Sequence, residues 1–191
     1  MKTKTPFIIA FLLMALAALT RLVPHIPNFT ALEGITLFGA AYLGSKQRSI
    51  FLVLLVMFLT DFILNNTIVR SFFTEQKGLV FFSDYMVFNA LSIIAMVWIG
   101  SFMLKKVTVL NIGTSALVAS IVFFLITNFG AWLTNHGLLY SRDFNGLMQA
   151  YIAGYPFLKS SFWGSMLFTF VIFGMYALVN KLIATRSLQN A

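Results

Sequence analysis

Three acidic residues, Glu33, Asp61 and Asp84, lie inside long apolar stretches of the sequence. An ionised side chain costs about 3 kcal/mol at the centre of a membrane-spanning helix, so it is usually kept there because it binds a partner. Arg21 follows another apolar stretch and is the nearest candidate cation. The acids could therefore bind a polar solute. Alternatively, Asp61 or Asp84 could form a structural ion pair with Arg21, and the sequence leaves both possibilities open.

Amide and aromatic side chains recur at helical spacing near these acids. Asn128 and Trp132 are four residues apart and share a helix face, as do Tyr151 and Tyr155. Acids, amides and flat rings beneath ordered loops are typical of a ligand pocket, although Trp and Tyr also gather at membrane interfaces. We predict an outward-facing substrate site lined by Arg21, His25, Asn28, Glu33, Asp61, Asp84, Asn128, Trp132, Tyr151 and Tyr155.

Signatures of catalysis are missing from the sequence. It contains no Cys, which excludes disulfides, thiolate chemistry and Cys-ligated metal centres within the chain. The two His residues are far apart, and no HExxH, GxSxG or Gly-rich phosphate loop is present. We therefore expect no catalytic residues, no metal and no cofactor. A membrane enzyme that uses the acids with His25 stays an alternative.

The composition places these residues in a membrane. Hydrophobic residues make up 60% of the 191 residues and charged residues only 9%, whereas a soluble domain carries about 25% charged residues. The net charge of +8 comes from Lys and Arg scattered between apolar stretches. This pattern is typical of topology signals and of contacts with anionic lipid headgroups rather than of nucleic-acid binding. We expect one multi-pass membrane domain, residues 1–191.

Hydropathy predicts an all-α protein with six transmembrane helices. The second is short for a hydrocarbon core of about 30 Å. The first also resembles a removable signal peptide, but we expect it to be retained. A short interfacial helix is predicted over residues 146–155, ended by Pro156. The predicted spans are residues 6–21, 31–44, 49–65, 79–104, 109–133 and 162–184.

Lys and Arg in the short loops predict the orientation. With both termini in the cytoplasm, 8 of the 13 basic residues lie inside, which agrees with the excess of Lys and Arg expected there. A re-entrant second helix would remove this bias. In the six-span arrangement Glu33, Asp61 and Asp84 lie near the outer ends of their helices, whereas the inner halves are almost entirely apolar. The polar residues therefore form a layer on the outer side.

Several motifs resemble those of a known group of membrane proteins. They are residues 21–30 (RLVPHIPNFT), 37–39 (LFG), Asp61, 127–132 (TNFGAW), 145–147 (NGL), 150–151 (AY) and 156–157 (PF). With these motifs the chain looks like an uncharacterised family of small bacterial membrane proteins. That family is similar to the substrate-binding (S) components of energy-coupling-factor (ECF) vitamin transporters. The resemblance covers about residues 15–175.

This resemblance implies an S-component-like bundle of six helices in the inner membrane of a bacterial cell, with a micronutrient pocket near the outer surface. It also implies a transmembrane scaffold subunit and ATPases as partners. S components that share a scaffold often carry an AxxxA pattern on the first helix, which the alanines of residues 10–18 do not form. We therefore predict a substrate-binding subunit for uptake of a small vitamin-like micronutrient, acting with such partners or alone. A structural or assembly protein with helix-locking polar residues is the alternative.

Overall fold

The fold is a bundle of helices. The computed structural model describes the backbone of residues 5–23, 26–135 and 137–189, and the side chains of residues 7–23, 26–135 and 137–186. No strand occurs among the described residues. The elements are α1 (Thr5–Leu19), the 3₁₀ turn η1 (Thr20–Leu22), α2 (Leu32–Tyr42), α3 (Lys46–Asn66), the 3₁₀ turn η2 (Arg70–Phe72), α4 (Asp84–Met103), α5 (Val109–Thr134) and α6 (Phe144–Gln189).

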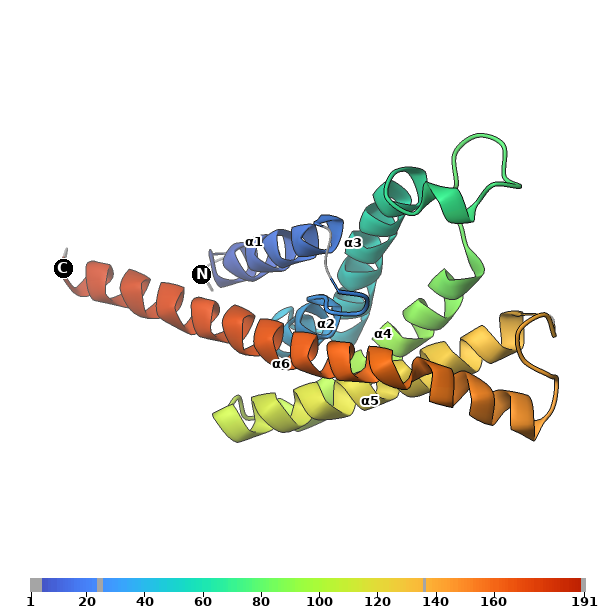
Figure 1. The fold of residues 1–191 in the computed structure, drawn as a ribbon. Coiled ribbons are helices and arrows are strands. Elements are labelled where there is room, and N and C mark those ends of the chain that lie inside the picture. Colours follow the sequence, from blue (N-terminus) through green and yellow to red (C-terminus); the bar gives the residue numbers. More distant parts are fainter. Residues whose placement is uncertain (1–4, 24–25, 136, 190–191) are drawn as a thin grey trace.

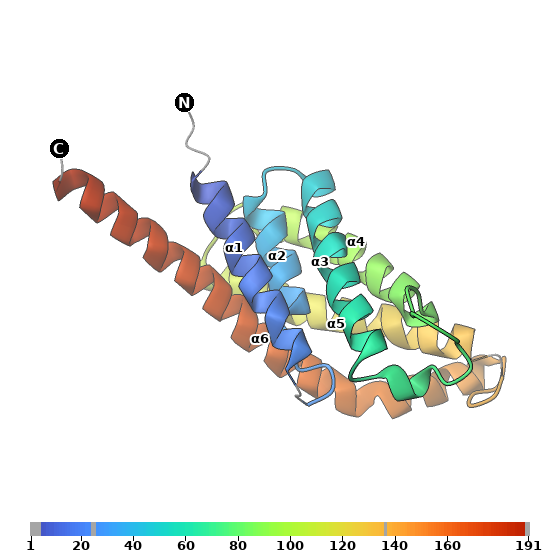
Figure 2. The same cartoon turned by 90° about the horizontal axis from the view of Figure 1, so that it is seen from above.

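Successive α-helices alternate in direction (Figures 1 and 2). The start of α1, the α2–α3 and α4–α5 connections and the end of α6 lie towards one end of the molecule. The described residues of the other connections, 26–31, 67–83 and 137–143, lie towards the opposite end, which we call the polar end. Neighbours along the chain therefore pack antiparallel, as expected for helices joined by short loops.

The short helix α2 forms the centre of the bundle. It packs against α1, α3, α4, α5 and α6, and every residue from 31 to 39 is buried. Its glycines permit this close packing. A Cβ atom on Gly34 would lie 3.0 Å from the backbone nitrogen of Thr169 in α6, and one on Gly39 would lie 3.3 Å from a Leu43 methyl group. Side chains that α2 carries at the polar end are therefore held inside the protein.

The outer surface of the bundle suits a lipid environment. Four helices, α3, α4, α5 and α6, are long and apolar enough to cross a membrane. Residues 7–22 form a shorter apolar helical segment, and α2 has only 11 residues. Large apolar side chains are exposed along most of the helices, for example Phe51, Trp98 and Phe102. The fold is therefore compatible with a multi-pass membrane bundle.

The predicted boundary around Pro156 is wrong. Residues 144–189 form one continuous helix, α6, with Pro156 in its interior, rather than a short helix over 146–155 and a span over 162–184. Proline removes one backbone hydrogen bond, a loss that neighbouring helices can compensate in membrane bundles. The polar residues after Pro156 looked like a loop, but Ser161 and Ser165 are buried against α2 and α5. Packing against α2 and α5 therefore stabilises α6 as one helix on both sides of Pro156.

The helices α3 and α4 also differ from the prediction at their starts. Ser45 caps α3, because its hydroxyl accepts a hydrogen bond from the Arg48 amide at 3.2 Å, so α3 begins at Lys46 rather than residue 49. Helix α4 begins at Asp84 rather than residue 79. The Asn66 side chain bonds both the amide and the carbonyl of Val80, at 2.9 and 3.0 Å, and these two bonds hold the segment before α4 extended.

Candidate functional site

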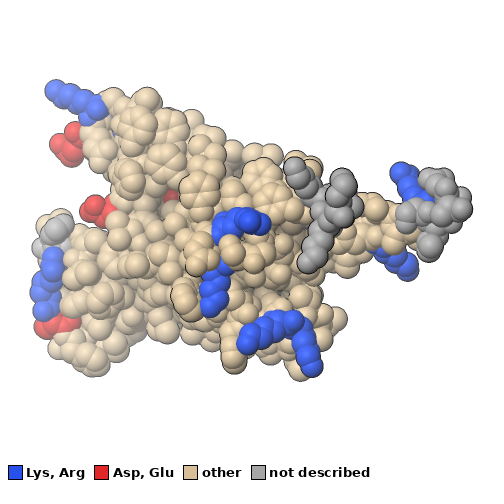
Figure 3. Space-filling view, turned by 180° about the vertical axis from the view of Figure 1, so that it is seen from behind, with Lys and Arg blue, Asp and Glu red and all other residues tan. Residues whose placement is uncertain are grey.

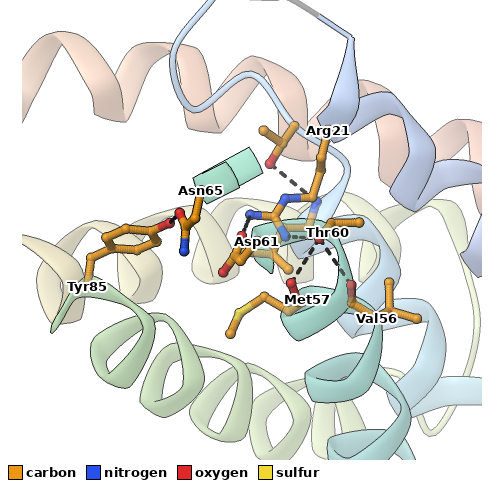
Figure 4. A network of polar contacts seen from close by, with 9 residues as sticks. Arg21, Val56, Met57, Thr60, Asp61, Asn65 and Tyr85 are labelled. Atoms are coloured by element: carbon orange, nitrogen blue, oxygen red, sulfur yellow. Dashed lines mark hydrogen bonds and ion pairs between the residues drawn. The ribbon is translucent and has the colours of Figure 1, made fainter. Parts of the chain in front are cut away.

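Arg21 and Asp61 form an ion pair at the polar end of the bundle (Figure 4). Arg21 Nη2 lies 2.6 Å from Asp61 Oδ1, and Nη1 donates a hydrogen bond to Thr60 Oγ1 at 2.6 Å. The Arg21 side chain is 11% exposed and that of Asp61 only 1%. The pair ties the turn after α1 to α3, and among the described residues it is the only ion pair. The predicted alternative partner of Arg21, Asp84, does not take part.

The turn η1 places Arg21 in this position. Thr20 follows the last residue of α1, and its hydroxyl donates to the carbonyl of Ala17 at 2.6 Å. The chain then tightens into a 3₁₀ turn, and the amide of Val23 donates to the carbonyl of Thr20 at 3.3 Å. Tight turns of this kind commonly finish helices. Here the turn directs the guanidinium inwards, towards α3.

Asn65 and Tyr85 extend the polar cluster from α3 to α4. The Tyr85 hydroxyl donates a hydrogen bond to Asn65 Oδ1, and Asn65 is completely buried one helical turn after Asp61. Within this cluster, two buried polar atoms have no hydrogen-bond partner among the described residues, Asp61 Oδ2 and Asn65 Nδ2. Buried polar groups almost always have a partner. An unpaired acceptor and an unpaired donor on one face of α3 therefore point to a ligand that would bind both.

A cavity of about 580 Å³ lies beside this cluster, a volume within the range of small-molecule sites. Its wall combines the ion pair with amides, hydroxyls and apolar side chains. Helices α2, α3, α4 and α5 contribute to it, together with the turn η1 and described residues just before α2. The lining residues are Arg21, Val23, Pro27, Asn28, Thr30, Leu32, Asp61, Leu64, Ile68, Val69, Tyr85, Asn89, Phe123 and Thr127.

The segment over residues 26–31, just before α2, lines one side of the cavity. Within it, the Phe29 amide donates to the carbonyl of Ile26 at 3.0 Å, and Asn28 adopts a φ of 61°. Asparagine is one of the few residues other than glycine that adopt this left-handed conformation readily. Asn28 lines the cavity as predicted, whereas the predicted residue His25 lies outside the described residues.

Of the predicted site residues, Arg21, Asn28 and Asp61 come together at the cavity. Glu33 does not line it, because α2 carries this side chain into the interior, where the Ser161 hydroxyl donates to it. Asp84 does not line it either. Since α4 begins five residues later than predicted, Asp84 is an exposed residue of its first turn rather than a residue inside the helix.

The predicted residues of α5 and α6 lie elsewhere. Trp132 Nε1 donates to the carbonyl of Ser141 at 2.9 Å, and the Tyr151 hydroxyl donates to the carbonyl of Leu125 at 3.0 Å. The Asn128 amide bonds the carbonyl of Phe124, one turn back in its own helix. Tyr155 is 54% exposed beside Lys159. These side chains satisfy local backbone groups or face outwards, and none of them lines the cavity beside Arg21 and Asp61.

Asp143 caps the start of α6 near these aromatic residues. Its Oδ1 atom accepts hydrogen bonds from the Ser141 hydroxyl at 2.6 Å and from the Gly146 amide at 2.8 Å. The Ser141 hydroxyl and then the backbone amide of Gly146 lower the pKa of the Asp143 carboxyl below its ordinary value of 3.8. In the space-filling view of Figure 3, which shows the molecule from behind, the visible acidic side chains all lie at one end.

Sequence reasoning missed several lining residues. Tyr85 and Asn89 are one helical turn apart in the sequence and line the cavity, but the predicted site does not include them. Thr30 and Thr127 lie close in sequence to the predicted residues Asn28 and Asn128, but nothing in the sequence marks these two threonines as lining residues. Among the described residues, no group of three or more His, Cys, Asp or Glu is arranged to hold a metal ion.

One protein family matches this sequence over nearly its whole length. The profile of a family of unknown function (DUF6580) matches residues 1–187. The chain belongs to this family. Nothing matches it among curated proteins or among solved structures. For this DUF6580 member, the site itself must therefore carry the functional argument.

Proposed function

We propose that this DUF6580 protein is a membrane transport component that binds a small vitamin-like solute in the cavity beside Arg21 and Asp61. The observation that carries the proposal is a cavity whose wall includes Asp61. The buried carboxylate oxygen Oδ2 of Asp61 is unpaired, and so is the buried amide nitrogen Nδ2 of Asn65, one helical turn further along α3. A solute with an N–H group next to a carbonyl oxygen would satisfy both atoms. Amides and nitrogen heterocycles have this pattern. The aromatic and aliphatic lining, including Tyr85 and Phe123, suits a flat ring.

We further propose that the polar end faces the outside of a bacterial inner membrane, with six spans and both termini in the cytoplasm. The support is the excess of Lys and Arg on the opposite side. Because the chain has no Cys, single cysteines introduced at Asn145 and Ser45 can be labelled without background. An impermeant maleimide should label position 145 in intact cells and position 45 only after lysis. The reverse pattern would refute this orientation.

A thermal-shift screen of the purified protein against vitamins and their precursors tests solute binding. A solute at 100 times its Kd adds about 2.7 kcal/mol of stability, which is a rise in Tm of about 5–10 °C for a protein of this size. Asn89→Ala should reduce the shift because this amide lines the cavity, whereas Asn145→Ala, on the first turn of α6, should not. The absence of any stabilising compound would count against the proposal.

Transport would require energy from elsewhere, because the sequence has no nucleotide-binding loop. Resemblance to ECF S components suggests a scaffold subunit and ATPases as partners, and action without them is the other possibility. Co-purification from native membranes distinguishes the two.

A structural role is the second candidate, and the 2.6 Å ion pair favours it. In that case Arg21 and Asp61 lock α1 against α3 and no solute binds. Replacing Asp61 by Asn would then lower stability without changing the response to any compound in the screen. If the protein binds solute, the same replacement should also abolish the thermal shift.

A further inference from the structure

Glu33 is a second buried carboxylate, and its role differs from that of Asp61. It lies in the first turn of α2, is 1% exposed and is enclosed by the core of the bundle. The Ser161 hydroxyl donates to Oε1, and the backbone amide of Glu33 itself also lies close to the carboxylate. Oε2 makes no hydrogen bond among the described residues. An ionised carboxylate can accept about four hydrogen bonds, so this environment is poor for a charge.

The charged groups around Glu33 come from few elements. Arg21, in η1, is close enough to act on Glu33 electrostatically, but its guanidinium is bound to Asp61 of α3. Helix α5 contains no ionisable residue. On the other helices packed against α2, the remaining ionisable groups are at least partly exposed, lie towards the far end or belong to the cavity wall. They are Asp84 and Tyr85 of α4, Lys46 and Arg48 of α3, and Tyr151, Tyr155, Lys159, Tyr176, Lys181 and Arg186 of α6.

The balance of buried charges indicates that one of the two carboxylates carries a proton. The site holds one guanidinium and two carboxylates. If both carboxylates were ionised, the interior would carry one uncompensated negative charge, which burial disfavours strongly. The start of α2 favours a negative charge near Glu33, but this helix-terminus effect is much smaller than the penalty for burying an unpaired ion. The three groups therefore require one bound proton for neutrality.

We propose that Glu33 and Asp61 share one proton and one cation, Arg21, and that the proton moves between them when Arg21 changes partner. In the observed arrangement Arg21 binds the Asp61 carboxylate and Glu33 carries the proton. When Arg21 turns to Glu33, the Glu33 O–H bond breaks and its proton binds Asp61, so the total charge is unchanged. Asp61 lines the open cavity, whereas Glu33 does not. A proton from the aqueous side therefore enters at Asp61 and reaches the core at Glu33.

This exchange connects the cavity to the helix at the centre of the bundle. A solute that binds the Asp61 carboxylate competes with Arg21 for it. Arg21 then moves towards Glu33 on α2, and the charge of Glu33 changes. If the proposed solute binding is correct, uptake is linked to a proton. The proton-sharing site itself does not depend on that function, because it follows from the three side chains alone.

Infrared spectroscopy of the purified protein without any solute tests the proposal. A protonated carboxyl group has a C=O stretch that is separate from those of carboxylates. The chain has only five acidic residues, so the spectrum is simple. At neutral pH the unmodified protein should show one protonated carboxyl. Glu33→Gln should remove this band, because Arg21 stays on Asp61.

The remaining variants test the exchange. Asp61→Asn should also remove the band, because Arg21 becomes free to bind Glu33, which then ionises. Arg21→Gln should double the band, because both acids then need a proton. Asp84→Asn, at an exposed position on α4, should leave it unchanged.

Three results would overturn the proposal: no band in the unmodified protein, a band that persists in Glu33→Gln, or a band that persists in Asp61→Asn. If Asp61→Asn does not fold, the doubling in Arg21→Gln decides the question, and an unchanged band there is equally fatal. Because no solute is present, a negative thermal-shift screen does not affect this test, and a failure here does not affect the screen.

Discussion

Two groups of polar and aromatic residues lie at the polar end of this bundle, and they differ in what surrounds them. In the first, Arg21, Asp61 and Asn65 are almost fully buried, and their bonds join η1, α3 and α4. In the second, Trp132 and Tyr151 bind nearby backbone carbonyls at the α5–α6 junction. Similar residue types thus form a cavity in one place and an exposed surface in the other. The first group is buried because three elements, η1, α3 and α4, meet around it, whereas the second lies where only α5 and α6 meet.

Removal of the cation should affect stability most strongly and should separate the two groups. Arg21→Ala leaves the buried Asp61 carboxylate without its partner, and breaking a buried pair in this way costs about 3–5 kcal/mol. Arg142→Ala, at an exposed position near the second group, should change stability by less than about 0.5 kcal/mol. Unfolding in detergent by heat or denaturant measures both. Equal effects would mean that burial does not distinguish the groups.

A smaller effect should appear when a single hydroxyl is removed from each group. Tyr85→Phe removes the hydrogen bond that orients the Asn65 amide, and the loss of about 1 kcal/mol should weaken solute binding by about fivefold to tenfold. Tyr155→Phe, outside the cavity, should leave the affinity unchanged. Titration calorimetry with a compound from the thermal-shift screen measures this contrast. A stronger effect of Tyr155→Phe would mean that the solute binds beside α6 and not in the cavity.

The smallest effect concerns the second group alone. Asp143→Asn should produce a slight decrease in Tm at neutral pH, because a neutral amide replaces the carboxylate that caps α6. Since the pKa of Asp143 is lowered on folding, its contribution is present above the ordinary value of 3.8 and is lost as the pH falls through the folded pKa. Tm profiles of the variant and the unmodified protein should therefore converge at acidic pH. A constant difference would exclude this role of the charge.

The sequence predicted the helical class and most of the helix positions. Apolar stretches are sufficient to locate α1, α2 and α5, because their ends coincide with changes in composition. It failed where a tertiary contact decides the boundary. The bonds from Asn66 to Val80 delay α4, and packing of Ser161 and Ser165 continues α6 past Pro156. Neither contact has a local signal.

The candidate site was predictable in part for the same reason. Arg21 and Asp61 were identifiable because charge inside an apolar helix is rare and needs an explanation. The roles of Glu33, Trp132 and Tyr155 were not, because helical spacing shows which residues share a face but not what that face meets. Only the packing of α2 and α6 places Glu33 in the core and leaves Tyr155 outside.

The continuous helix α6 also has a mechanical consequence. Its 46 residues extend over about 70 Å, whereas a whole bilayer is about 40–45 Å thick. It contacts α5 near the polar end, and its last turns extend past the other helices (Figure 2). If a helix of this length moves as a rigid body, a tilt of about 10° about one end displaces the other end by about 12 Å. Small rearrangements beside the cavity would therefore be amplified on the opposite face of the membrane.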